Sequence, residues 1–83
     1  MSKILVEINL PVANKKFDVY IPVEGKVGEI LILSTQLLSE LSDGNFKGDE
    51  NVVLIDLEYN HILDVNKFVG ETQIRNGSRL MMI

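Results

Sequence analysis

Two stretches near the N-terminus alternate apolar and polar side chains with the period of two that is typical of half-buried strands. They cover residues 3–10 and 16–23. The positions expected to face the core are Ile4, Val6, Ile8 and Leu10, and then Phe17, Val19, Ile21 and Val23. Leu5 would face outward. Pro11 and Asn14 lie between the stretches and indicate a turn, so the pattern predicts a β-hairpin.

The period changes to 3.6 after Gly25, which predicts one amphipathic helix. Its apolar face would comprise Val27, Ile30, Leu31, Ser34, Leu37, Leu38 and Leu41. Residues 42–45, Ser-Asp-Gly-Asn, provide a C-terminal stop. Ile32 projects nearly opposite to the apolar face. It would either mark a second surface or lie under the polar loop of residues 45–51, and we favour the loop.

Residues 51–57 are rich in Val, Leu and Ile and predict a third strand. One face would carry Val53, Ile55 and Leu57, and the other Val52, Leu54 and Asp56. Because an aspartate is expected to stay in water, we predict that the Asp56 face is exposed, which exposes Leu54 as well.

The C-terminal part predicts two further strands. Residues 62–65 allow only a brief strand, and residues 79–83 alternate again, with Leu80 and Met82 toward the core and Met81 and Ile83 outward. The order of hairpin, helix, strand, short strand and final strand is an α+β layer arrangement. A chain of this length has room for one core, so we predict a single domain over residues 1–83.

The end of the chain carries the most specific resemblance to a known family. Leu63 and Val69, followed by Ile74-Arg75-Asn76-Gly77-Ser78-Arg79-Leu80-Met81-Met82-Ile83, resemble the close of ubiquitin, where an apolar anchor precedes a left-handed turn and an alternating last strand. Gly77 suits that turn because glycine adopts positive φ without strain. The resemblance covers nearly the whole chain. It implies a ubiquitin-like β-grasp fold, a mixed sheet of four to five strands packed on one helix.

Ubiquitin-like modifiers and sulfur carriers end in a flexible Gly-Gly tail, whereas this sequence ends at Ile83 within a predicted strand. It is similar to the bacterial YukD/EsaB-like proteins of type VII (WXG100) secretion systems. This resemblance implies a non-conjugated protein-interaction module, a cytoplasmic accessory component whose partners are secretion-machine proteins. Two alternatives stay open: a ubiquitin-like carrier or modifier related to sulfur carriers, and a small non-catalytic subunit of an enzyme complex.

Charge and composition exclude two classes of partner, nucleic acids and the membrane interior, and they indicate a cellular location. Twelve acidic and eight basic residues give a formal charge of −4, and the basic residues are too scattered to neutralise a row of phosphates, so we expect no nucleic-acid partner. The longest apolar stretch, residues 30–33, is far shorter than the roughly 20 residues of a membrane span, so we expect no membrane insertion. Cysteine is absent and the N-terminus lacks an export signal, which favours a cytoplasmic location.

Few residues suggest catalysis or metal binding. His61 is the only histidine, and its place in a predicted turn favours a solvated side chain. The carboxylate pairs Asp49-Glu50 and Asp56 with Glu58 lack the ligand order of a calcium loop. We predict no catalytic residue, no metal site and no cofactor, and hence a protein that is not an enzyme.

The outward-facing apolar residues are the candidate protein-binding surface. On the outer face of a ubiquitin-like sheet we expect Leu5, Leu54, Met81 and Ile83 to lie together, and Ile32 on the helix is a second candidate. Such side chains expose apolar area that folding alone does not require. A protein partner would cover them, or a homodimer would form on this face.

Overall fold

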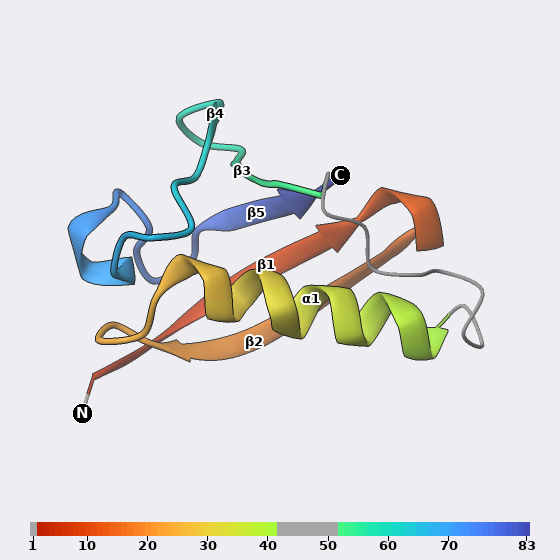
Figure 1. The fold of residues 1–83 in the computed structure, drawn as a ribbon, viewed down its shortest axis with the longest axis horizontal. Helices are drawn as coiled ribbons and strands as arrows, with labels where there is room; N and C mark the ends of the chain where they lie inside the picture. The colour runs from red at the N-terminus through yellow and green to blue at the C-terminus, as the bar shows by residue number, and fades with distance from the viewer. Residues whose placement is uncertain (1, 42–51) are drawn as a thin grey trace.

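The computed structural model describes residues 2–41 and 52–83 and places one helix across one face of a five-stranded sheet (Figure 1). Strands β1 (Lys3–Leu10) and β2 (Lys15–Pro22) form the N-terminal hairpin, and helix α1 (Val27–Leu41) follows. The C-terminal part contains β3 (Leu54–Asp56), β4 (His61–Ile62) and β5 (Arg79–Met82). Single 3-10 turns lie at Pro11–Ala13 and Val69–Glu71. The arrangement confirms the predicted β-grasp fold.

The strand order β2-β1-β5-β3-β4 brings the first and last strands together at the centre of the sheet. β1 pairs parallel with β5, and the other neighbours pair antiparallel. In this order, β2 and β4 form the two edges of the sheet. β4 is shorter than the predicted strand of residues 62–65.

The turn before β5 holds this strand against β1. Gly77 has a φ of 90°, in the left-handed region that favours glycine. Its N–H donates to the carbonyl of Leu5 at 2.7 Å, and the N–H of Leu5 donates to Oδ1 of Asn76 at 2.8 Å. The N–H of Glu7 then donates to the carbonyl of Ser78 at 2.9 Å. These bonds set the register of β5 on β1.

The core lies between α1 and the sheet. Its buried apolar side chains are Val6, Ile8, Leu10, Ile21, Val27, Ile30, Leu38, Leu54, Leu63, Val69, Ile74, Leu80 and Met82. The buried face of α1 is narrower than predicted, because Leu31 and Leu37 are partly buried and Leu41 is exposed. Ser34 is buried in this face, and its hydroxyl donates to the carbonyl of Ile30 at 2.8 Å. The predicted helix stop at residues 42–45 lies outside the described residues.

The register predicted for the third strand is wrong by one residue. Leu54 and Asp56 are both fully buried on the helix side of the sheet, so Ile55 between them faces outward. Asp56 is accommodated because it ends β3: its Oδ1 accepts the N–H groups of Glu58 at 2.9 Å and Tyr59 at 3.4 Å. This is a common role of aspartate in turns. Leu54 shares the face of Asp56, and that face belongs to the core.

Truncating Leu80 tests which face of the sheet forms the core, since Leu80 lies on the central strand β5 and has no exposed surface. We expect Leu80→Ala to lower the free energy of unfolding by about 2–5 kcal/mol, the range for truncating a buried leucine. Ile32→Ala on the exposed side of α1 is the control and should change it by no more than about 0.5 kcal/mol. Urea unfolding followed by circular dichroism measures both, and equal effects would contradict the assignment.

Asp56 tests how the chain tolerates a buried carboxylate, because its Oδ2 has no hydrogen-bond partner among the described residues. Asp56→Ala removes the acceptor of two turn N–H groups and should cost about 1–3 kcal/mol of unfolding free energy. Asp56→Asn keeps an acceptor and removes the buried charge, so its loss should be smaller. If urea unfolding gives equal losses for both variants, the charge itself stabilises the turn.

Candidate functional site

The sheet face opposite α1 carries a row of apolar side chains. Cross-strand pairing places Met81 of β5 beside Ile55 of β3, and Ile55 beside Ile62 of β4. These residues face away from the helix, because their chain neighbours Leu54 and Leu80 are buried beneath it. Side chains directly opposite one another on one face are close enough to pack together. The row therefore forms one continuous apolar strip.

A second pair extends the strip along the strands. Val53 donates its N–H to the carbonyl of Ile83 at 2.8 Å, and Ile83 donates to the carbonyl of Val53 at 3.1 Å. Each lies two residues from Ile55 or Met81 and so occupies the same face. Ile62 is 62% exposed and Ile83 is 51% exposed, while the other three are half-buried. We call Val53, Ile55, Ile62, Met81 and Ile83 the outer patch.

The structure brings two of the predicted surface residues, Met81 and Ile83, into the outer patch. Leu54 is fully buried, so its prediction as a surface residue is wrong. The error follows from the register of β3, where the buried aspartate accepts turn N–H groups through its Oδ1 and is not turned toward the solvent. Ile55 occupies the outward position instead.

Leu5 faces outward as predicted but lies apart from the outer patch. It is half-buried and pairs with Tyr20 of the edge strand, which is 69% exposed. Glu7 of β1 and Arg79 of β5, which pair directly, lie between Leu5 and Met81 on this face. A partner that covers the outer patch therefore need not contact Leu5.

Ile32 is 60% exposed on α1, which covers the opposite face of the sheet (Figure 1). It cannot share one flat partner surface with the outer patch. The alternative that it lies under the loop of residues 45–51 concerns residues outside those described.

Sequence reasoning missed three residues of the outer patch: Val53, which shares its face with Ile55, Ile55 itself and Ile62. The predicted register assigns Ile55 to the core, although a useful signal was present: Asp56 stands just before a turn, where its side chain commonly binds backbone N–H groups. Ile62 belongs to a strand of two residues, which is too short for an alternating pattern to show its face. Only its pairing with Ile55 places it.

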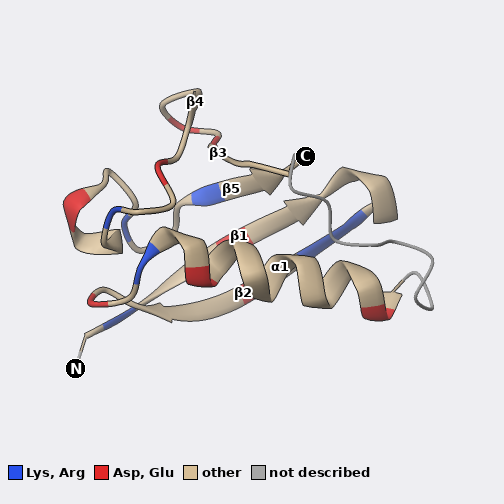
Figure 2. Ribbon diagram, viewed as in Figure 1, with Lys and Arg blue, Asp and Glu red and all other residues tan. Residues whose placement is uncertain are grey.

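A row of charged residues crosses the same face beside the outer patch. Asp18 of β2, Glu7 of β1 and Arg79 of β5 are paired across neighbouring strands. Arg79 lies two residues before Met81. In the described part of the chain, Lys and Arg are spread over separate strands and turns (Figure 2). An apolar centre with a charged border is the composition of many protein interfaces.

An ion pair joins the turn before β5 to the turn after β3. Arg75 donates to Oε1 of Glu58 at 2.8 Å, and this hydrogen bond raises the pKa of Arg75. Both side chains are largely exposed, so the pair contributes little to stability.

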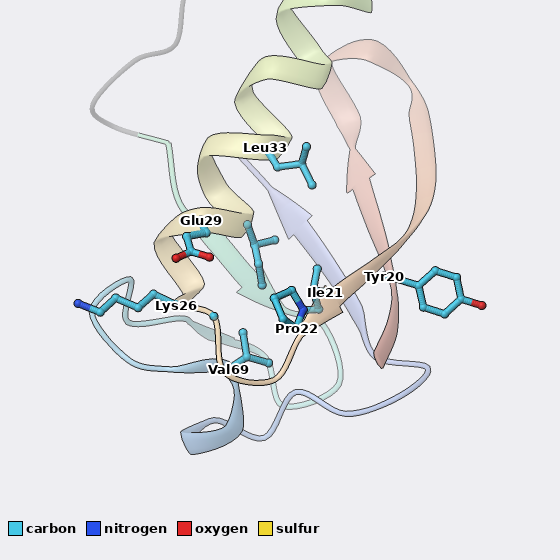
Figure 3. Close-up of a pocket in the computed structure, with 9 residues that line it drawn as sticks. Tyr20, Ile21, Pro22, Lys26, Glu29, Leu33 and Val69 are labelled. Atoms are coloured by element: carbon cyan, nitrogen blue, oxygen red, sulfur yellow. The ribbon is translucent and has the colours of Figure 1, made fainter. Parts of the chain in front are cut away.

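A small cleft lies between the end of β2 and the start of α1 (Figure 3). Ile21, Ile30 and Leu33 give it apolar walls, and Glu29 lies at its border. Figure 3 shows the ring of Tyr20 turned away from it. Its volume of about 180 Å³ is below the roughly 300–1,000 Å³ of typical ligand pockets. It is therefore a weaker candidate than the outer patch.

The described residues give no sign of a metal centre. Within 2–41 and 52–83, no three His, Asp or Glu side chains gather as ligands. His61 is exposed on β4, opposite Asp56 in the strand pairing. In the same ranges, no helix is long and apolar enough to cross a bilayer.

Comparison by sequence finds no matching family model and no matching curated protein. Solved structures match the fold. The ubiquitin-like domain of the type VII secretion system protein EccD1 from Mycobacterium tuberculosis superimposes with a TM-score of 0.71 and 15% identity, and the match covers 100% of this chain and 99% of that chain. A chain in the MycP5-free ESX-5 inner membrane complex gives a TM-score of 0.69 and 15% identity, covering 100% of this chain and 21% of that chain.

A third match is a protein whose structure is described as molecular mimicry of SUMO that promotes DNA repair. It gives a TM-score of 0.72 and 14% identity, covering 100% of this chain and 92% of that chain. The matches thus include proteins described in very different terms. At these identities the likeness establishes a ubiquitin-like β-grasp fold, and the function has to be argued from the surface.

Proposed function

We propose that this chain is a non-catalytic, non-conjugated ubiquitin-like module that binds a protein partner through the outer patch. The observation that carries the proposal is the continuity of apolar side chains over three neighbouring strands, from Met81 through Ile55 to Ile62. They face away from the core, so the strip is not part of the packing against α1. Contiguous exposed apolar area bordered by charge is characteristic of protein-binding surfaces.

We further propose that the partner belongs to a bacterial type VII secretion system, where this chain acts as a cytoplasmic accessory component. The support is the likeness to the ubiquitin-like domain of EccD1, which extends over nearly the whole of both chains. A similar domain lies within a chain of the ESX-5 inner membrane complex. A domain of this fold would act there through contacts with other proteins, and the outer patch supplies the surface for such contacts.

Ile62→Glu tests the outer patch, with Ile32→Glu as the matched control. The two isoleucines are exposed to 62% and 60%, so each substitution should change the unfolding free energy by only about 0.5 kcal/mol. Ile62→Glu should weaken partner binding by at least about tenfold, as expected for a residue that contributes about 1.4 kcal/mol or more at an interface. Ile32→Glu should leave binding unchanged.

The measurement is a pull-down of the tagged chain from its native cells, with immunoblots for the ATPase and membrane proteins of the type VII apparatus. Melting temperatures confirm that both variants are folded. Loss of binding in Ile32→Glu but not in Ile62→Glu would move the surface to the helix. If the outer patch instead recovers proteins from outside the type VII apparatus, the protein-binding role of the patch stands and the secretion assignment is rejected.

A further inference from the structure

β2 is an edge of the sheet, and no described strand covers its side away from β1. The N–H of Val23 donates to the carbonyl of Ser2 at 3.0 Å. The N–H and C=O groups of Val23 therefore point toward β1. Peptide groups alternate in direction along a strand, so those of Lys16, Asp18 and Tyr20 point outward. These groups form a short ladder that another strand can join.

The charges along this edge favour a second copy of β2 as the joining strand. Lys16 and Asp18 project from the outer face of the sheet, on either side of Phe17, which packs toward the core. In an antiparallel pair related by a twofold axis, outward-pointing residues must face one another to exchange hydrogen bonds. If the axis passes at Phe17, Lys16 of each copy faces Asp18 of the other. Both cross-strand pairs then join opposite charges.

Other registers of the same pairing are less favourable. If the axis passes at Lys16, the two copies of Lys16 lie opposite each other, and if it passes at Asp18, the two copies of Asp18 do. Like charges directly opposite one another destabilise a strand pair. An axis at Val19 places Lys16 opposite Pro22, which has no N–H to donate. Among these registers, the charge pattern and the missing N–H of Pro22 favour the one centred on Phe17. A lysine on the edge also discourages unrelated strands.

We propose that two copies of this chain pair through β2, antiparallel and centred on Phe17, to form a homodimer with one continuous sheet. The outer patch stays free, because it lies on β5, β3 and β4, beyond β1 from the pairing edge. The twofold axis runs perpendicular to the sheet, so both outer patches face the same side. The dimer then presents two binding surfaces to one assembly, which raises avidity without new contacts.

Charge reversal and charge exchange test the pairing. Asp18→Lys and Lys16→Asp each place like charges opposite one another in the dimer and should weaken it by about tenfold. The variant that carries both substitutions restores opposite charges and should dimerise like the natural chain. Folding should survive, because Asp18 pairs with Glu7 within the chain and Lys16 pairs with Asn9, so no attractive cross-strand pair is lost. Lys67→Asp, far from the edge in sequence and exposed, is the control.

Sedimentation equilibrium up to about 1 mM protein, where a complex with a Kd near 100 µM is mostly dimeric, gives the association constants. Hydrogen exchange supplies an independent measurement. In the dimer the amides of Lys16 and Asp18 should exchange slowly, and they should exchange fast on dilution or in Asp18→Lys. The amides of Phe17 and Val19, which point toward β1, should stay protected throughout.

A monomer at every concentration would overturn the proposal. So would a dimer that ignores both charge reversals, or one that leaves the Lys16 and Asp18 amides unprotected. A dimer that Ile62→Glu dissociates would place the contact on the outer patch instead. None of these outcomes decides whether the patch binds a different protein, so this test and that of the proposed function can fail separately.

Discussion

The parallel pairing of β1 with β5 is the constraint on which the rest of this structure depends. It joins the two ends of the chain, and the turn around Gly77 fixes it by binding both backbone groups of Leu5. Because β5 lies between β1 and β3, its inward residues Leu80 and Met82 are buried at the centre of the core. Its outward residue Met81 is placed beside Ile55 by the same pairing. The register of β5 thus determines both which of its residues enter the core and which join the outer patch.

The position of β5 also determines how the two proposed contacts are distributed. The outer patch is built on β5, β3 and β4, whereas β2 stands alone beyond β1 at the other edge. A partner on the patch and a second copy on the edge would therefore not compete. Their chemistry differs as well, because the patch offers apolar side chains and the edge offers backbone hydrogen bonds ordered by charge. We therefore expect that a substitution on the patch, or one on the edge, removes its own contact and leaves the other intact.

Asp56 shows how a local turn overrides a general rule about burial. A carboxylate is costly to bury unless it is hydrogen-bonded, and two N–H groups of the following turn donate to Oδ1 of Asp56, while its Oδ2 has no partner among the described residues. The strand then turns its leucine inward and its isoleucine outward. In its outward position, Ile55 is the residue of the outer patch that links Met81 to Ile62.

The sequence by itself determined the hairpin, the helix and the last strand, because alternation over residues 3–10 and 79–83 and the helical period after Gly25 are strong local signals. It also identified the left-handed turn at Gly77 and the outward positions of Met81 and Ile83. Tertiary structure alone decided the face of β3, where three residues give too short a pattern and an aspartate misleads. It also decided which strands are neighbours, and hence that Leu5 stands apart while Ile55 and Ile62 join the patch. The face of β3 and the neighbours of each strand are set by pairing between segments that are distant in the sequence, and a local pattern of apolar and polar residues does not encode such pairing.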